Sequence, residues 1–430
     1  MIVLYKILTA FVFILVLPIL PLLYLFSKKR RASLAPRLGF STGLLPGIKT
    51  KKRIWIHALS VGEVKSAVPL VKALKETKKN VEIIFTASTQ TGFEMATTLF
   101  LNESLVDQVA YFPFDLGFSI RRIHQRINAD AVVIVETDVW PNFLYEMNKI
   151  NIPVVLINAR LSKRSLNGYL KFKPFVHLFF SFLTRIMAQT ALDKERYQKL
   201  GIDHKKIVVT GNIKFDQLFE KMDSIAIQKL KQQLGIRKKD EVVLAGSTHE
   251  GEEKILLSWF KKVSQRTDTV KLVIAPRNPQ RSMMLNKTFL SEKILSALMS
   301  EPDLTETHPK VIFVDKMGEL SRLYAICDLA FVGGSLVDEG GHNPLEPAVY
   351  AKPVLIGPDM SDFTEISKLL INGGGTIMVD SDKRLEEQLN ILLNNRERRE
   401  QMGAENFKIF SAHSGAVKKI VSHMEQLSIV

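Results

Sequence analysis

The sequence predicts an α/β protein with two Rossmann-like domains, preceded by an N-terminal membrane anchor. Three observations support this prediction. Short β-branched runs alternate with longer amphipathic segments, the runs fall into two sets separated near residues 211–240, and one long uncharged apolar run stands near the N-terminus. Near-continuous apolar strands joined by helices indicate parallel sheets that are covered on both faces.

The apolar run comprises residues 7–26 and is long enough to cross a bilayer core as a helix. A cleaved signal peptide is the alternative interpretation, but the run lacks a clear small-x-small cleavage site. Basic residues follow at 28–31, and by the positive-inside rule they place the rest of the chain on the cytoplasmic side. We therefore expect an anchor over residues 1–27 and a basic juxtamembrane segment over residues 28–52.

The chain has a net charge of +15, and the basic residues are concentrated in segments without acids. Nine Lys or Arg lie between Ser27 and Arg53, and five more lie between Asn158 and Phe175. Basic residues beside an apolar run favour an anionic membrane over nucleic acid, and no zinc-finger or RNP-type motif is present, so no nucleic-acid partner is expected. The single cysteine, Cys327, excludes an internal disulfide and is expected to be a buried thiol.

Ten strand candidates form the two sets. The first set is RIWIHA (53–58), VEIIFTA (81–87), AVVIVE (131–136), PVVLIN (153–158) and RIMAQ (185–189); the second is EVVLAG (241–246), KLVIAP (271–276), KVIFVD (310–315), LAFVGG (329–334) and PVLIG (353–357). We expect a first domain over residues 53–220, a polar linker over 221–240 and a second domain over 241–430. Whether the last helices cross back to the first domain is left open.

Ligands of parallel α/β sheets bind at the carboxyl ends of the strands, so the loops after the strands are where a site is expected. The first such loop, HALSVGEVKSA, places Glu63 in the first turn of a helix. A first-turn acid interacts favourably with the helix dipole, and a carboxylate at this edge can also act as a general base. The residues alone leave both interpretations open.

Three further loops of the first half carry charged residues. Glu136 follows the third strand, where an acid is costly unless it is paired or used, and this favours a functional role. Arg160, Lys163 and Arg164 form either a solvated loop or a site that recognises phosphate on an acceptor. Lys214, in GNIKFD, is either a surface lysine or a cation that neutralises a leaving phosphate.

The most informative loop of the second half is GGSLVDEGGHNPLEP, residues 333–347. Its glycines allow the backbone to approach a ligand closely. Asn343, Pro344 and Glu346 fit a helix start, with a cap, a proline in the first turn and an acid three residues after the cap. A helix N-terminus after a glycine-rich loop is also a phosphate site, so capping and binding are compatible.

Six motifs, taken together and in order, resemble the bacterial transferases of Kdo (3-deoxy-D-manno-oct-2-ulosonic acid) in lipopolysaccharide synthesis. They are HALSVGEVKSA, ETDVWPNFL, NARLS, GNIKFD, APRNPQR and GGHNPLEPA, and the likeness runs from the N-terminal anchor to about residue 415. The resemblance implies the GT-B architecture, with two Rossmann-like domains facing a cleft. It also implies an inverting glycosyltransferase that moves Kdo from CMP-Kdo to a lipid A precursor of the lipid IVA type. Asn278 stands where the family pattern leads us to expect His, which weakens any role for that side chain.

The resemblance implies roles for individual residues. Glu63 matches the general base, and Glu136 and Lys214 match positions that stabilise the transition state. The residues that match the CMP-binding segments are Pro276, Arg277, Met317, Gly318, Glu319, Asn343, Pro344, Leu345 and Glu346. The basic residues of NARLSKRS are the expected acceptor-binding residues. The expected partners are CMP-Kdo, a phosphorylated lipid A precursor and the inner membrane, with the catalytic domains on its cytoplasmic side.

Asp380 and Asp382 fit the D-x-D pattern of metal-dependent glycosyltransferases, but they stand just before a helix-prone run and are interpreted as a helix cap. Neither a metal nor another cofactor is therefore expected. Two alternatives stay open. One is another GT-B enzyme that uses a UDP-sugar and a different lipid, which competition by CMP or UDP would separate. The other is a non-catalytic membrane-surface binding protein, which would bind lipid without turnover.

Overall fold

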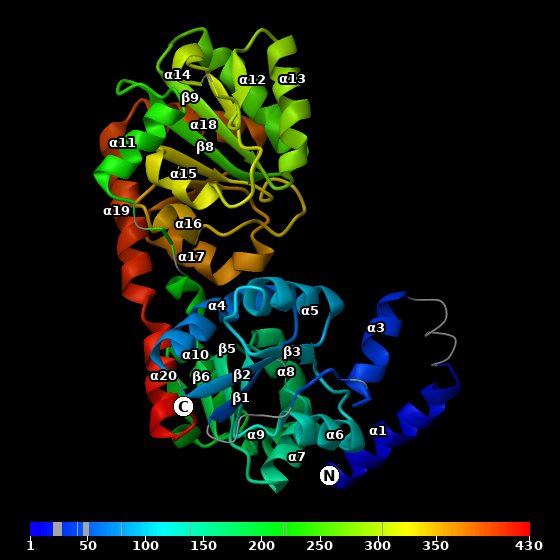
Figure 1. The fold of residues 1–430 in the computed structure, drawn as a ribbon. Coiled ribbons are helices and arrows are strands. Elements are labelled where there is room, and N and C mark those ends of the chain that lie inside the picture. Colours follow the sequence, from blue (N-terminus) through cyan, green and yellow to red (C-terminus); the bar gives the residue numbers. More distant parts are fainter. Residues whose placement is uncertain are drawn as a thin grey trace. The chain divides into compact units, whose positions relative to one another are not determined.

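The computed structural model of the 430-residue chain describes residues 1–19, 28–40, 42–45, 51–78, 80–137, 139–217, 219–220, 222–302 and 304–430. These residues form two compact units, each built around one sheet (Figure 1). Unit 1 comprises Met1–Gln217 and His413–Val430, and unit 2 comprises Leu218–Ala412.

The described part of unit 1 contains a parallel seven-stranded sheet in the order β3-β2-β1-β4-β5-β6-β7. Its strands are β1 (Lys52–Ala58), β2 (Val81–Ala87), β3 (Gln108–Tyr111), β4 (Ala131–Val135), β5 (Val154–Ala159), β6 (Arg185–Ala188) and β7 (Ile207–Val209). Its helices are α1 (Ile2–Val16), α3 (Lys28–Arg37), α4 (Val61–Thr77), α5 (Gln90–Ala96), α6 (Gly117–Ile127), α7 (Pro141–Lys149), α8 (Lys163–Lys171), α9 (Lys173–Ser181), α10 (Ala191–Lys199) and α20 (Ala416–Gln426), with short turns η1 (Leu17–Ile19), η2 (Thr97–Leu101), η3 (His204–Lys206) and η4 (Ile213–Asp216).

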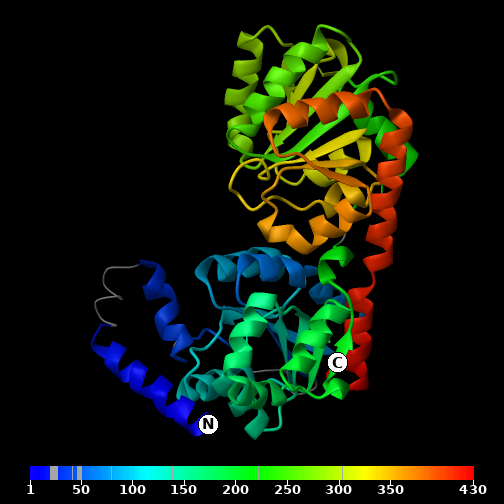
Figure 2. The same cartoon turned by 180° about the vertical axis from the view of Figure 1, so that it is seen from behind.

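Helices cover both faces of this sheet, which explains why its strands are apolar at nearly every position. Trp55 of β1 packs on one face, in a core shared with α6, α7, α9 and α10. Its neighbours Ile54 and Ile56 pack on the other face with α4, α5 and α20. The C-terminal helix α20, red in Figure 2, contacts α4 within unit 1. Because successive strand residues point to opposite faces, burial of both faces requires a continuous apolar run.

Unit 2 repeats this architecture in its described residues, with a parallel sheet in the order β10-β11-β9-β8-β12-β13-β14. Its strands are β8 (Glu241–Thr248), β9 (Val270–Pro276), β10 (Ser296–Leu298), β11 (Val311–Phe313), β12 (Leu329–Val332), β13 (Val354–Ile356) and β14 (Thr376–Met378). Its helices are α11 (Ser224–Gln233), α12 (Glu252–Ser264), α13 (Ser282–Ser291), α14 (Leu304–Thr307), α15 (Leu320–Ile326), α16 (Leu345–Ala348), α17 (Thr364–Asn372), α18 (Asp382–Leu393) and α19 (Arg396–His413), with turns η5 (Pro279–Arg281) and η6 (Ser361–Phe363).

The prediction of two parallel α/β sheets is confirmed, and all ten expected strands are present. Four strands that the sequence did not reveal, β3, β7, β10 and β14, are the two edge strands of each sheet. Each is three or four residues long, like the predicted strands β6, β11, β12 and β13, but it has a neighbouring strand on one side only. Residues 224–233, inside the expected linker, form α11, and Leu230 packs in a core of unit 2. Cys327 is a buried thiol, as expected.

The N-terminal helix α1 packs on unit 1 along one side. Lys6 Nζ lies 2.7 Å from Glu146 Oε1, Tyr5 donates a hydrogen bond to Asp115, and Thr9 accepts one from Asn142. Among the described residues, no helix combines the length and the apolar character needed to cross a bilayer. The expected span, residues 7–26, extends beyond the described part of the chain, because residues 20–27 lie outside it.

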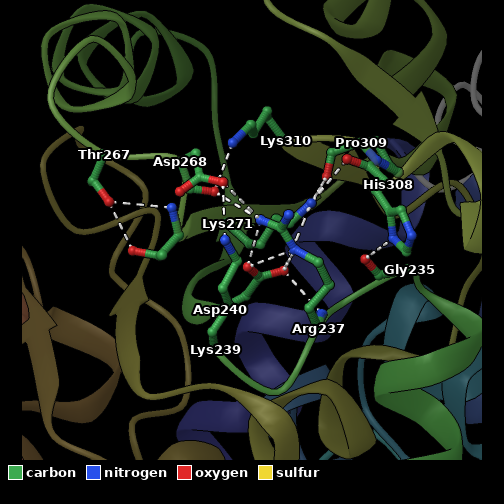
Figure 3. A network of polar contacts seen from close by, with 11 residues as sticks. Gly235, Arg237, Lys239, Asp240, Thr267, Asp268, Lys271, His308, Pro309 and Lys310 are labelled. Carbon is green, nitrogen blue, oxygen red and sulfur yellow. Dashed lines mark hydrogen bonds and ion pairs between the residues drawn. The ribbon is translucent and has the colours of Figure 1, made fainter.

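A buried ion cluster lies at the amino-terminal edge of the unit 2 sheet (Figure 3). Lys271 donates hydrogen bonds to the carbonyl oxygens of His308 and Pro309 at 2.9 and 2.6 Å, and its Nζ lies 3.9 Å from Asp240 Oδ2. Arg237 forms a further ion pair with Asp240 at 2.9 Å. Desolvation lowers the pKa of Lys271 to about 8, against the opposing effect of Asp240. The cluster joins the starts of β8 and β9 to the residues that precede β11, at the edge opposite to the expected site.

Candidate functional site

The unit 1 sheet reverses its strand order between β1 and β4, and ligands of open α/β sheets bind outside the carboxyl ends of the strands at such a point. Glu63 follows β1 by way of a short loop, and Glu136 directly follows β4. Both carboxylates that the sequence singled out therefore lie at the reversal point. Ser66 links Glu136 to α4, the helix that carries Glu63, because its Oγ lies 2.9 Å from Gly62 O and 3.3 Å from Glu136 Oε1 and can donate its proton to either.

Glu63 occupies the first turn of α4 and is 7% exposed. Ser60 is the N-cap, and its Oγ accepts a hydrogen bond from Glu63 N at 3.5 Å, while Glu63 Oε2 accepts one from Leu59 N at 2.5 Å. The helix-capping interpretation of this residue is thus present in the structure. Capping holds the carboxylate in a defined place at the end of β1, so it is compatible with a second role as a general base.

Glu136 is half-buried and has a left-handed backbone conformation, with a φ of +65°. Such a φ is uncommon for a residue other than glycine and costs on the order of 1–3 kcal/mol, and residues of this kind cluster at functional sites. Its Oε1 accepts hydrogen bonds from Ser66 Oγ and from Asn158 Nδ2, each at 3.3 Å. These two contacts orient the carboxylate above the carboxyl ends of β4 and β5.

Asn158 is a residue whose importance the sequence did not reveal. It lies near the end of β5 with a φ of +50°, and its side chain is fully buried. While its Nδ2 donates to Glu136, its Oδ1 accepts a hydrogen bond from Ile213 N at 3.1 Å. Asn158 therefore joins Glu136 to the η4 turn that contains Lys214. The signals in the sequence were an amide residue at a strand end and its place as the first residue of the NARLS motif, and neither indicated this role.

Lys214 lies in η4, which Asn212 caps by accepting a hydrogen bond from Lys214 N at 3.0 Å. Its neighbours Ile213 and Phe215 are buried, so the turn is held against the sheet, and Lys214 itself is half-buried. One chain of hydrogen bonds thus runs from Ser66 of α4 through Glu136 and Asn158 to Ile213 of η4, and these elements carry the three expected catalytic residues.

A pocket of about 310 Å³ opens beside Glu136 and the end of β5. Its lining residues are Glu136, Thr137, Val139, Arg160, Leu161, Ser162, Ser165, Tyr169, Phe180 and Tyr197. Of the expected acceptor-binding residues, Arg160 lines this pocket, whereas Lys163 and Arg164 are exposed in the first turn of α8 and do not line it.

In unit 2 the strand order reverses between β8 and β12, and the loops after these two strands are held together by Glu252. The side chain of Glu252 is fully buried. Its Oε2 accepts hydrogen bonds from His249 N and Gly334 N at 2.9 Å, and its Oε1 accepts from Ser335 N and Leu336 N at 3.1 Å. A carboxylate with four backbone donors fixes both loops at the carboxyl edge of the sheet. The sequence did not assign this role to Glu252.

The expected CMP-binding residues end or follow strands of the unit 2 sheet, and so they stand at its carboxyl edge. Pro276 ends β9, and Arg277 N donates to Thr248 O at 2.9 Å. The segment after β11 contains exposed Met317 and Gly318, and Glu319, which pairs with Arg322.

The third expected CMP-binding segment, residues 343–346, opens α16 after β12. Asn343 Oδ1 accepts a hydrogen bond from Leu345 N at 3.1 Å, but the N-cap of α16 is Pro344, so the helix begins one residue later than the sequence predicts. Leu345 is fully buried, Pro344 precedes the helix, and Glu346 lies in its first turn.

The D-x-D residues Asp380 and Asp382 are both exposed. Between them, Ser381 is the N-cap of α18 and accepts a hydrogen bond from Arg384 N, in agreement with the capping interpretation. Within the described ranges, no group of three or more His, Cys, Asp or Glu residues is arranged to hold a metal ion.

Two family models match the chain. One, described as 3-deoxy-D-manno-octulosonic-acid transferase (kdotransferase), matches residues 32–217, and the other, glycosyl transferases group 1, matches residues 226–408. A 3-deoxy-D-manno-octulosonic acid transferase of Haemophilus influenzae is 35% identical over 414 residues, which cover 95% of this chain and 94% of the relative. A transferase of the same name from Chlamydophila psittaci is 31% identical over 82% of this chain and 79% of its own length.

Solved structures with a similar fold include a UDP-GlcNAc 2-epimerase from Neisseria meningitidis and MurG from Acinetobacter baumannii. The first is 17% identical with a TM-score of 0.57 and covers 87% of this chain and 100% of its own. The second is 14% identical with a TM-score of 0.56 and covers 87% and 99%. At these identities the likeness shows the fold alone, which is the two-unit α/β fold of the GT-B type.

Proposed function

The chain belongs to the 3-deoxy-D-manno-octulosonic acid (Kdo) transferase family, and from this premise we propose that it transfers Kdo from CMP-Kdo to a hydroxyl group of a phosphorylated lipid A precursor. Membership makes it a glycosyltransferase of lipopolysaccharide biosynthesis. The donor, the acceptor and the roles of single residues are the parts that we propose. The single observation that carries them is the placement of Glu63 and Glu136 at the strand-order reversal of unit 1, where Glu136 is bonded to Ser66 of α4, the helix whose first turn contains Glu63.

We assign the role of general base to Glu63. A sugar hydroxyl is a weak nucleophile at neutral pH, so a carboxylate that takes its proton in the transition state accelerates the attack. The hydroxyl oxygen of the acceptor then bonds to the anomeric carbon of Kdo while the bond to the CMP phosphate breaks on the opposite face. The configuration at that carbon is inverted, and the electron pair of the broken bond leaves with CMP.

Glu136 and Lys214 stabilise this transition state in our proposal. Positive charge develops on the sugar and negative charge on the departing phosphate, and a carboxylate and an ammonium group held in place offset these charges without reorganisation. Asn158 supports both groups, because it binds the Glu136 carboxylate and the backbone of the Lys214 turn at once.

The donor nucleotide belongs to unit 2 in this proposal, at the carboxyl edge formed by the ends of β9, β11 and β12. The segments concerned are 276–277, 317–319 and 343–346. The glycine-rich loop and the start of α16 offer backbone N–H groups that suit a phosphate, and Glu346 can accept hydrogen bonds from ribose hydroxyls.

The acceptor binds beside Glu136 in the pocket that Arg160 lines. Arg160, together with exposed Lys163 and Arg164, forms a basic surface next to the pocket, and such a surface suits the phosphate groups of a lipid A precursor.

We also propose that the protein is held at the cytoplasmic face of the inner membrane by its N-terminal segment. In α1 the side chains that do not face unit 1 are apolar, and Leu4, Ile7 and Phe11 are 70%, 61% and 55% exposed. Large exposed apolar side chains on one helix face suit a lipid environment, and the basic residues that follow suit anionic head groups.

The test is a transfer assay with purified full-length protein, CMP-Kdo and a tetraacylated lipid A precursor, with the products weighed by mass spectrometry. We expect a product heavier than the acceptor by Kdo residues, and inhibition by CMP but not by UDP. Transfer from a UDP-sugar, or inhibition by UDP alone, would contradict the proposed donor. Binding of the lipid without any turnover would contradict the proposed reaction.

A further inference from the structure

Two histidines meet at the strand-order reversal of unit 2, and the mechanism above does not use them. His249 directly follows β8, and His342 lies in the glycine-rich loop after β12. Their Nε2 atoms are 2.8 Å apart, and their rings are stacked with centroids 5.1 Å apart at 15°. One of the two nitrogens must carry a proton and the other must accept it, because two N–H groups or two lone pairs would repel each other.

This pair has a rigid support. The carboxylate of Glu252 accepts the N–H of His249 and of Gly334, so it fixes the two loops that bring the rings together. Gly334 has a φ of +66°, and a Cβ placed there would lie 3.0 Å from Cδ2 of His342 and 3.4 Å from Cδ2 of His249. A side chain at this position would therefore combine backbone strain with crowding of both rings.

The pair also stands between the segments that we assign to the nucleotide. Arg277 N is hydrogen-bonded to Thr248 O, next to His249 in the chain, and His342 directly precedes Asn343, which accepts a hydrogen bond from the first residue of α16. A ligand held by both segments would thus have the two imidazole groups beside it.

We propose that His249 and His342 bind the carboxylate of the donor sugar. This inference rests on the proposed function, since Kdo is an ulosonic acid and carries a carboxylate at the carbon next to its anomeric centre. A carboxylate oxygen accepts hydrogen bonds from imidazole N–H groups, and two such groups side by side can each donate to it. Without that ligand, the Nε2 atoms of the two histidines share a hydrogen bond with each other.

Glu339 completes the arrangement on the far side of one ring, where its Oε1 lies 3.7 Å from His249 Nδ1. This carboxylate lies at the ring nitrogen that does not face His342, so it leaves Nε2 of His249 for the ligand. A neutral sugar would offer the pair no anionic acceptor, so the two histidines favour donors with a sugar carboxylate over other nucleotide sugars.

The alternative is that the pair only joins two loops, and nucleotide binding separates the two explanations. CMP lacks the sugar carboxylate, whereas CMP-Kdo has it. The substitutions His249→Leu and His342→Leu, made in the full-length protein, remove the N–H groups while keeping a side chain of similar size. His204→Leu is the matched control, because His204 lies in unit 1 with a side chain 71% exposed.

We expect each variant at the pair to raise the donor KM for CMP-Kdo by about 10- to 100-fold, because that is the usual effect of losing a hydrogen bond to a charged group. The Kd for CMP, measured by calorimetry, should change less than about twofold. If the wild type is active, two results would overturn this inference and leave the proposed function intact. One is that the variants weaken the binding of CMP and of CMP-Kdo equally, and the other is that their donor KM is unchanged. A wild type that does not use CMP-Kdo would overturn the proposed function and this inference with it.

A second measurement does not depend on the variants. In the ¹⁵N NMR spectrum of the wild-type protein without acceptor, CMP-Kdo should shift the imidazole nitrogen resonances of His249 and His342. The reason is that hydrogen bonds to the ligand replace the hydrogen bond between the two Nε2 atoms. CMP alone should leave these resonances close to their positions in the free protein. Identical shifts with both ligands would contradict the assignment.

Discussion

Replacement of Asn158 by alanine should weaken the site of unit 1 and slow turnover, because Asn158 joins Glu136 to the turn that carries Lys214. Its side chain is fully buried, and its Oδ1 accepts the hydrogen bond of Ile213 N. Without that acceptor, a buried backbone N–H loses its partner at a cost of about 1–3 kcal/mol. Glu136 loses one of the two hydrogen bonds described above.

The backbone at Asn158 adds a second cost, since its φ of +50° suits asparagine and glycine better than alanine. This conformation costs alanine about 1–2 kcal/mol. Together with the lost hydrogen-bond acceptor, Asn158→Ala should therefore destabilise unit 1 by about 2–5 kcal/mol. Asn158→Gly lacks the conformational cost and should destabilise it by about 1–3 kcal/mol. Asn128→Ala is the matched control, because exposed Asn128 also has a φ of +50° but ends α6 away from the site.

The assay is amide hydrogen exchange at Ile213, measured together with kcat. Because about 1.4 kcal/mol corresponds to a factor of ten, Asn158→Gly should accelerate this exchange by about 10- to 100-fold and lower kcat by a similar factor. Asn158→Asp keeps an oxygen for Ile213 N but places a second carboxylate beside Glu136. It should therefore protect the Ile213 amide and still lose activity.

Unchanged exchange at Ile213 in Asn158→Gly would refute the assigned hydrogen bond. Wild-type kcat in Asn158→Asp would refute the role of the Asn158–Glu136 contact in catalysis. Loss of stability in Asn128→Ala as large as in Asn158→Ala would show that the backbone conformation alone explains the effect.

Three further outcomes are expected. Burial lowers the pKa of Lys271 from its ordinary value of 10.5 to about 8 in the folded chain, so the folded state binds fewer protons than the unfolded state between these values, and stability should rise with pH across this window. Lys271→Met should flatten that slope in pH-dependent denaturation curves, and an unchanged slope would place the titrating group elsewhere. Neutralising Arg160, Lys163 and Arg164 together should raise the acceptor KM about tenfold or more and leave the donor KM unchanged. A change in the donor KM alone would mean that these residues bind the nucleotide. Activity should survive EDTA, because a helix N-terminus and Lys214 replace a cation in the proposed mechanism; loss of turnover that magnesium restores would contradict this.

The sequence revealed the central strands of both sheets and the loops after them, because burial on two faces demands apolar runs that are visible along the chain. The residues of β1, for example, pack alternately into two cores. The edge strands were not predicted, and what distinguishes them from equally short predicted strands is that each has a neighbouring strand on one side only. The helix starts at Glu63 and Ser381 were also visible, and the start near Asn343 was displaced by one residue, because helix starts depend on residues that are near each other in sequence.

The supporting contacts of the site could not be read from the sequence, because they join residues that are far apart in the chain. Asn158 acts through Ile213, 55 positions away, and Glu252 acts through Gly334, 82 positions away. The left-handed conformation at Glu136 also depends on the packed sheet around it, and nothing in ETDVWPNFL indicates it. The N-terminal run is a different case, since its apolar character was evident but its contacts with Glu146 and Asp115 were not.

The assignment of Glu63 as the general base is the central claim about the reaction, and Glu63→Gln tests it most directly. Glutamine keeps an oxygen that can accept the hydrogen bond from Leu59 N, so the start of α4 should remain intact. It cannot accept a proton from the acceptor hydroxyl. Asp382→Asn is the matched control, because it makes the same change of carboxylate to amide in the first turn of α18, at an exposed position.

The measurement compares kcat, the Kd for CMP and the melting temperature of Glu63→Gln with those of the wild type and of Asp382→Asn. We expect kcat of Glu63→Gln to fall by about 10²–10⁴-fold with little change in CMP affinity or melting temperature, and Asp382→Asn to keep wild-type turnover. A near-normal kcat with a lowered melting temperature would contradict the account. Glu63 would then be a helix-capping residue, and Glu136 would become the next candidate for the base.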